Sequence, residues 1–249
     1  MSGHSKWSSI KHKKAITDAR RGQAFTKVIR EITVAARAGG SDVEGNARLR
    51  MAVQAARDVN MPKETIERAI KKGAGGIDGV SYEDVVYEGY GPAGVAVYVE
   101  ASTDNKNRSA ADIRHLFSKY NGNLGEVGCV GWMFKRRGQI MVPAQGVDED
   151  ALMEAALEAG ADDVRNEDDT FVVLTEWSDL MKVRGAIEEA GIKVESATVA
   201  MTPGNTVKVE GKDAETLIKL INALEESDDV RAVSANYEIE DALLEKIMA

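Results

Sequence analysis

The spacing of the apolar residues changes at the glycine-rich stretch between Gly73 and Gly76. Before the change, apolar residues recur with the period of a helix, about 3.6 residues. After it, stretches such as "EDVVYEGYGPAGVAVYVEAS" alternate as strands do, around a Gly/Pro turn. The sequence therefore predicts an α+β protein with a helical N-terminal part, followed by domains that mix strands and helices. The length of 249 residues suffices for two or three such domains.

Three helices are predicted in the first third of the chain: from Ala15 to Gly39, from about Asn46 to Val59, and from Pro62 to Lys72. Each has an apolar face that can be buried against the others. These faces consist of Phe25, Val28, Ile29 and Ile32 in the first helix, Leu49, Val53 and Ala56 in the second, and Ile66 and Ile70 in the third. Together with a basic tail they predict a three-helix domain over residues 1–80.

The rest of the chain predicts two ferredoxin-like α/β domains, one inserted in the other. Residues 138–203 follow the order strand, helix, strand, strand, helix, strand, which is typical of a split βαββαβ unit. Its segments are Gln139–Val142, Asp148–Ala159, Asp163–Asn166, Thr170–Thr175, Ser178–Ala190 and Lys193–Met201. The following stretch, 204–240, is too short to bury a core alone. It is expected to complete the domain begun at residue 81, so the middle domain would comprise 81–137 plus 204–240.

Two shorter stretches of the middle domain carry predictions of their own. The sequence "GEVGCVGWMF", from Gly125 to Phe134, alternates and predicts a strand. The polar "STDNKNRS", residues 102–109, leads into a helix that Ser109 and Asp112 could open with a capping box. The loop and first-turn backbone donors can be satisfied by Asp104, Asn105 and Asn107. Alternatively this stretch forms a contact surface, with secondary nucleic-acid contacts from Lys106 and Arg108.

Charge is distributed unevenly along the chain. The formal net charge is −9, yet residues 1–75 hold 16 Lys/Arg and 7 Asp/Glu, a charge of +9, which leaves −18 on the remainder. Such an asymmetry suggests an interaction arm on an acidic, solubilising body. An acidic body repels a polyanion, so the N-terminal part should make the main contacts with a nucleic acid.

The basic stretch "GHSKWSSIKHKKAITDARRGQAFTKVIREI" is the strongest candidate for a binding site. Lys and Arg neutralise phosphates and release counterions, and a Trp can stack on an exposed base. The alternative is a solvated, frayed tail. The candidate nucleic-acid-binding residues are His4, Lys6, Trp7, Lys11, His12, Lys13, Lys14, Arg20, Arg21, Lys27, Arg30 and Arg37.

The residues present argue against disulfide, metal, catalytic and dinucleotide sites. A single cysteine, Cys129, cannot form an intrachain disulfide or a multi-Cys zinc site, and its setting suggests a buried structural thiol. Three histidines, His4, His12 and His115, have no triad or metal-ligand spacing. The G-x-G-x-x-G match at Gly89–Gly94 precedes a strand, so a hairpin turn is favoured over a dinucleotide site. We therefore expect a cytoplasmic, non-enzymatic protein without metal, cofactor or membrane partner.

Several motifs resemble one known family. They are "GHSKW", "KHKKA", "FTKVIREI", "NARLR", "YEGYGP", "STDNKNR", "GNLGEVGCVGWMF" and "EAALEAGADDV", and they occur in order over almost the whole chain. The chain is similar to the YebC/PmpR family. The resemblance implies an N-terminal helical domain and two α/β domains, one inserted into the other. It brings no accepted catalytic residues, but its basic N-terminal motif carries over to His4, Lys6, Trp7, Lys11, His12, Lys13 and Lys14.

The resemblance implies two biochemical settings. Bacterial members are usually described as transcriptional regulators that bind DNA, whereas mitochondrial relatives are translational activators linked to ribosomes and to relief of stalling. Both agree with a nucleic-acid-binding regulator, and the residues leave DNA and ribosomal RNA open as partners. A ligand-sensing or protein-interaction module is the second class of hypothesis, and an enzyme is the third.

Overall fold

The computed structural model describes residues 18–75, 82–167 and 169–248. The predicted α+β class is confirmed. The described residues fall into two compact units: unit 1 comprises 82–135 and 201–248, and unit 2 comprises 18–75 and 136–200. Unit 2 thus contains a helical part (18–75) and an inserted part (136–200). The finer three-domain boundaries expected from the sequence stay a prediction.

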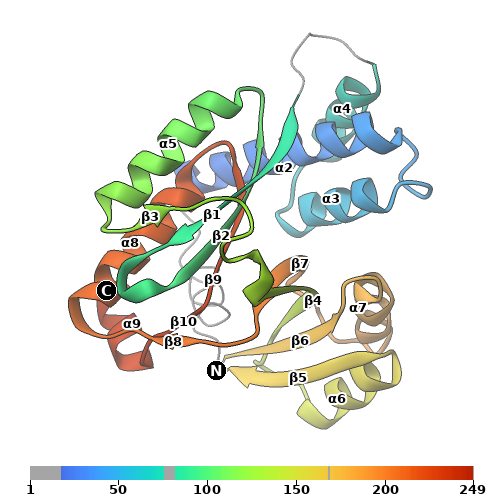
Figure 1. Ribbon diagram of the computed structural model, residues 1–249. Coiled ribbons are helices and arrows are strands. Elements are labelled where there is room, and N and C mark those ends of the chain that lie inside the picture. Colours follow the sequence, from blue (N-terminus) through green and yellow to red (C-terminus); the bar gives the residue numbers. More distant parts are fainter. Residues whose placement is uncertain (1–17, 76–81, 168, 249) are drawn as a thin grey trace. The chain divides into compact units, whose positions relative to one another are not determined.

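The helical part of unit 2 consists of α2 (Asp18–Gly39), α3 (Ala47–Asp58) and α4 (Lys63–Ala74), and α2 packs against both other helices (Figure 1). The predicted apolar faces form its core, with Ile32 and Leu49 fully buried. Asn46 joins the end of α2 to the start of α3. Its side-chain amide donates to the Ala35 carbonyl at 2.8 Å, and its oxygen accepts from the backbone N–H of Leu49.

The inserted part is built on a four-stranded sheet. Its elements are β4 (Phe134–Pro143), α6 (Glu149–Glu158), β5 (Ala161–Glu167), β6 (Thr170–Glu176), α7 (Leu180–Glu189) and β7 (Ser196–Pro203). The sheet order β5-β6-β4-β7 agrees with the predicted βαββαβ unit. Both helices pack on one face, which carries the buried Ile140 and Val173. Strand β4 starts earlier than expected, so "KRRG" lies within it.

Unit 1 contains a second four-stranded sheet, in the order β3-β1-β2-β9 (Figure 1). Its elements are β1 (Glu83–Tyr90), β2 (Ala96–Thr103), α5 (Lys106–Lys119), β3 (Asn123–Leu124), β8 (Val207–Lys208), α8 (Gly211–Glu226), β9 (Val230–Ala235), β10 (Tyr237–Glu238) and α9 (Asp241–Met248). As predicted, the C-terminal stretch completes this unit, because β9 pairs antiparallel with β2. Phe117 of α5 and Leu217 of α8 are fully buried in its core.

The strand predicted for "GEVGCVGWMF" was wrong. Val127–Val130 forms turns and bends, followed by a short 3₁₀ helix at Gly131–Met133. The cause is the buried carboxylate of Glu88 on β1, which accepts hydrogen bonds from the backbone N–H groups of Gly128, Val130 and Gly131 at 2.6–2.8 Å. Backbone donors that bond to a side chain cannot also form a strand ladder.

Candidate nucleic-acid interface

The tail candidates lie outside the described residues. They are His4, Lys6, Trp7, Lys11, His12, Lys13 and Lys14. Arg20 and Arg21 fall in the first turn of α2, where the backbone is described and the side chains are not. The proposed role of these nine residues therefore stays a prediction.

The remaining candidates lie along α2. Lys27 and Arg30 are partly buried and Arg37 is exposed. The other side of α2 packs on the helical core, where Phe25 and Val28 are partly buried. The predicted apolar face of α2 thus packs on the helical core, but Lys27 and Arg30 are less exposed than predicted for the outward face. Each of the three cations already makes a polar or charged interaction within the chain, so a phosphate would have to compete with an internal partner.

A further basic stripe on α4 escaped the sequence analysis. Arg68, Lys71 and Lys72 are exposed, and within the described ranges none of them has an ion-pair partner. Their i, i+3, i+4 spacing places them on one face of α4. That spacing is visible in the sequence, but the main binding candidates were taken only from the tail and the first helix. The stripe adds exposed positive charge on α4 to that of Arg37 on α2.

Helix α4 is held close to α2 at Gly73. A Cβ added to Gly73 would come within 2.4 Å of the Thr33 carbonyl oxygen on α2, too close for any side chain. Thr33 and Gly73 are both buried. This close approach fixes the backbone of α4 just after the basic stripe, so the stripe belongs to a rigid helix pair.

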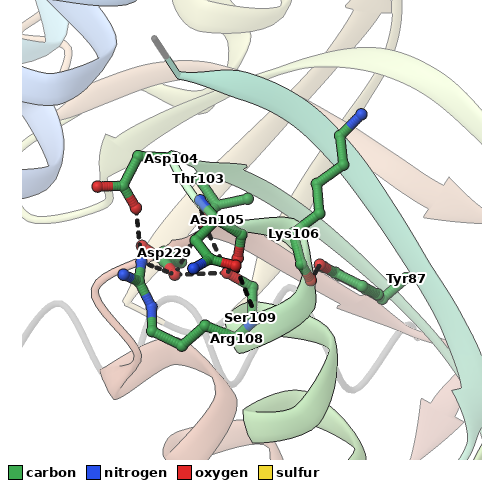
Figure 2. Close-up of polar contacts among 8 residues, drawn as sticks. All are labelled: Tyr87, Thr103, Asp104, Asn105, Lys106, Arg108, Ser109 and Asp229. Carbon is green, nitrogen blue, oxygen red and sulfur yellow. Dashed lines mark hydrogen bonds and ion pairs between the residues drawn. The ribbon is translucent and has the colours of Figure 1, made fainter. Parts of the chain in front are cut away.

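The two secondary candidates begin α5, and Figure 2 shows how they are placed. The Arg108 guanidinium donates to Asp104 at 2.8 Å and to Asp229 at 2.9 Å, and these hydrogen bonds to the two carboxylates raise its pKa. The Lys106 ammonium is directed away from this cluster and lies 2.5 Å from Glu83. Both charges are locally balanced, which favours the capping interpretation over a contact surface.

Asp229 is the centre of that cluster. Its Oδ2 also accepts from the hydroxyl of Ser109 at 2.5 Å and from that of Thr103 at 3.1 Å (Figure 2). The capping box predicted for Ser109 and Asp112 was therefore wrong. Helix α5 starts one turn earlier, and its N-cap is Asn105, whose side-chain oxygen accepts from the backbone N–H of Arg108. The Ser109 hydroxyl is instead committed to a carboxylate from the C-terminal stretch.

The remaining motifs have structural roles. Gly89–Gly94 forms the predicted hairpin turn, closed by a hydrogen bond from the Gly91 N–H to the Val95 carbonyl at 2.8 Å. Cys129 lies in the loop after β3, and burial, followed by the charge of Glu88, raises the pKa of its thiol. A raised pKa lowers the thiolate fraction, so the residue is a poor nucleophile.

His115 is exposed on α5. The described part of the chain contains no group of three or more His, Cys, Asp or Glu arranged as metal ligands. None of the helices in the described ranges combines the length and apolar character that a membrane span requires.

Both the helical part and the α/β part of the chain match models of one protein family. The family model described as "TACO1/YebC protein N-terminal domain" matches residues 5–76, and "TACO1/YebC second and third domain" matches residues 82–237. The chain belongs to the TACO1/YebC family.

Individual relatives resemble the chain over its full length. A probable transcriptional regulatory protein of Geobacter sp. (strain M21) is 54% identical, with 100% of both chains covered. One of Pelotomaculum thermopropionicum is 57% identical over 97% of this chain and 100% of its own. The crystal structure of a conserved hypothetical protein from Aquifex aeolicus, 49% identical, superposes with a TM-score of 0.84 over 90% of this chain and 93% of that one.

Proposed function

We propose that the chain is a non-enzymatic, nucleic-acid-binding regulator of gene expression. The observation that carries the proposal is the charge of its N-terminal third, +9 over residues 1–75 against −18 over the remainder. A polyanion is attracted to the first region and repelled by the second. The names of the relatives, probable transcriptional regulatory proteins, support a regulatory role.

We assign phosphate binding to the tail, the start of α2 and the exposed stripe of α4. Each phosphate neutralised by Lys or Arg releases counterions, so affinity falls as salt rises. If eight cations between Lys6 and Arg30 meet phosphates on duplex DNA, the slope of log K against log salt should be about −7. A slope near −1 would contradict this picture of the tail.

One experiment distinguishes DNA from ribosomal RNA as the partner. The purified chain is sedimented through a gradient with ribosomes, with excess duplex DNA as competitor, beside a chain that starts at Gly22. Retention of the full chain on ribosomes despite the DNA, and loss of the shortened chain, would identify RNA as the partner and the tail as its anchor. Release by DNA would favour transcription.

A matched variant controls for the loss of charge alone. Lys11, Lys13 and Lys14 are changed to Gln in one variant, and Lys119, Lys212 and Lys219, which are exposed in unit 1, in the other. Both lose three positive charges, but only the first should lose binding. Equal behaviour of the two variants would show that the binding surface had been assigned to the wrong region.

A further inference from the structure

Exposed apolar side chains of unit 1 gather around one loop. Among its described residues, the large hydrophobic side chains that are exposed are Val127 at 82%, Trp132 at 75% and Tyr90 at 37%. Val127 and Trp132 lie in the loop Gly125–Met133, which we call the Trp132 loop, and Tyr90 ends the neighbouring β1. Single exposed hydrophobics are ordinary, but three at one place point to a binding function.

The Trp132 loop is held firmly in place. The buried Glu88 carboxylate accepts three of its backbone N–H groups, and the Glu88 carbonyl accepts from the Gly125 N–H at 2.8 Å. Val130, in the middle of the loop, is fully buried. Hydrogen bonds to a charged group are stronger than neutral ones. The exposure of Trp132 is therefore a fixed property of the fold and not a result of a loose loop.

The polar groups of the two aromatic side chains are satisfied within the loop. The Trp132 indole N–H and the Tyr90 hydroxyl both donate to the Cys129 carbonyl, each at 3.2 Å. Because both donors already have an acceptor within the chain, a binding partner need not supply one. The surface that the indole offers a partner is its flat π face. Stacking on a nucleobase uses that surface alone, and every base can supply a matching face.

The size and charge of the surroundings favour a base over other occupants. Three side chains are far fewer than the roughly 20–30 residues a side of a stable protein interface. Unit 1 carries 18 Asp/Glu and 10 Lys/Arg over residues 82–135 and 201–248, so it repels phosphates that run along its surface, and it also repels a second copy. Stacking brings the uncharged base, and not a phosphate, into contact with the ring.

We propose that Trp132 is a stacking platform for one unpaired nucleobase of a single-stranded or looped nucleic acid. The inference rests on the proposed function, which supplies the grip on phosphates, and adds a preference for unpaired strands. A base inside a duplex is stacked on its neighbours and cannot reach the ring. The platform thus favours an RNA with exposed bases over duplex DNA.

The test uses the full chain with Trp7→Phe and Trp177→Phe, which leaves Trp132 as its only tryptophan. A labelled single-stranded 12-mer RNA of mixed sequence and the corresponding duplex are titrated at 50 mM salt. Fluorescence anisotropy of the RNA reports binding, and tryptophan emission reports stacking. We expect the single strand to quench Trp132 and the duplex to leave its emission unchanged.

Substitutions then measure the contribution of the ring. In the otherwise native chain, Trp132→Ala should weaken single-strand binding by about 5- to 100-fold with little change for the duplex, and Trp132→Phe should retain most of the affinity. Trp177→Ala is the matched control, because Trp177 is also exposed, at 47%, but has Arg136 at 4.9 Å over its ring. This control should bind as the native chain does.

Two different results would overturn the inference, and they are distinguishable. If the RNA binds while Trp132 emission and the affinity of Trp132→Ala stay at native values, the stacking platform is wrong and the proposed function stands. If the native chain binds neither single strand nor duplex at 50 mM salt, the proposed function fails and the platform fails with it.

Discussion

The helical part and the inserted part of unit 2 carry opposite charge excesses. Residues 18–75 hold 12 Lys/Arg and 7 Asp/Glu, whereas residues 136–200 hold 6 and 15. At the contact between them the signs are reversed. Arg184 of the acidic inserted part makes two hydrogen bonds, both 2.9 Å, to Asp58 of the basic helical part. This contact is therefore made by one specific ion pair and does not follow from a general attraction between the opposite net charges of the two parts.

The pair differs from the basic stripes in its environment. The side chains of Arg184 and Asp58 are only 5% and 12% exposed. Burial opposes the charge of Arg184, but hydrogen bonds and attraction from Asp58 and Glu188 raise its pKa overall. Buried pairs are screened by salt much less than exposed ones. Exposed cations on α4 can make salt-sensitive, reversible contacts with a partner, whereas the Arg184–Asp58 pair stabilises the fold.

Breaking this pair should produce the largest effect. Asp58→Ala leaves the Arg184 charge buried without its main partner, and we expect a loss of about 3–5 kcal/mol in the free energy of unfolding of unit 2. Urea unfolding measures it. Asp163→Ala, which removes an exposed partner of Arg165, is the control and should cost less than about 1 kcal/mol. The double change Asp58→Leu with Arg184→Met should recover much of the stability, and failure to recover would contradict the pair's role.

Neutralising the α4 stripe should have a smaller effect, and mainly on binding. With Arg68, Lys71 and Lys72 changed to Gln, the salt slope should become shallower by about 2–3 if all three meet phosphates, a roughly 10- to 50-fold loss of affinity. Stability should fall by only about 1 kcal/mol, because the side chains are exposed and what is lost is the favourable position of Lys71 and Lys72 in the last turn of α4. As a counterpart, Asp148→Asn with Glu149→Gln in the inserted part should leave the slope unchanged. An unaltered slope in the α4 variant would remove the stripe from the interface.

Local sequence patterns predicted most of this fold. Periodicity alone identified α2, α3 and α4 to within a few residues, and the order of elements identified the βαββαβ sheet. The C-terminal stretch was predicted to complete the unit begun at residue 81, because it is too short to fold alone, but its pairing with β2 through β9 was not predicted. The stripe of α4 was predictable by the same periodicity.

The errors share a physical cause, which is a carboxylate distant in sequence. Ser109 has the local features of an N-cap, but its hydroxyl bonds to Asp229, 120 residues away, and Asn105 caps the helix instead. The alternation of Gly125–Phe134 resembles a strand, but Glu88 draws the backbone N–H groups of Gly128, Val130 and Gly131 into a turn. Such contacts cannot be inferred from neighbouring residues. The Trp132 loop, and with it the exposed ring, depends on one of them.

The smallest effect on stability is expected for two arginines whose ion pairs lie outside the buried contact of Arg184 and Asp58. Arg48 of α3 makes two hydrogen bonds to Glu31 of α2, at 2.7 and 3.1 Å, and their side chains are 30% and 20% exposed. Arg165 of the inserted part bonds to Asp163 with side chains 41% and 47% exposed. Because bidentate, partly buried pairs gain more than exposed ones, Arg48→Met should lower the free energy of unfolding by about 1 kcal/mol and Arg165→Met by about 0–0.5 kcal/mol.

Urea unfolding in 0.1 and 1 M NaCl measures both costs. Salt should abolish the cost of Arg165→Met and leave most of that of Arg48→Met, because exposed pairs are screened more strongly. Equal costs at both salt concentrations would mean that burial does not separate the two pairs.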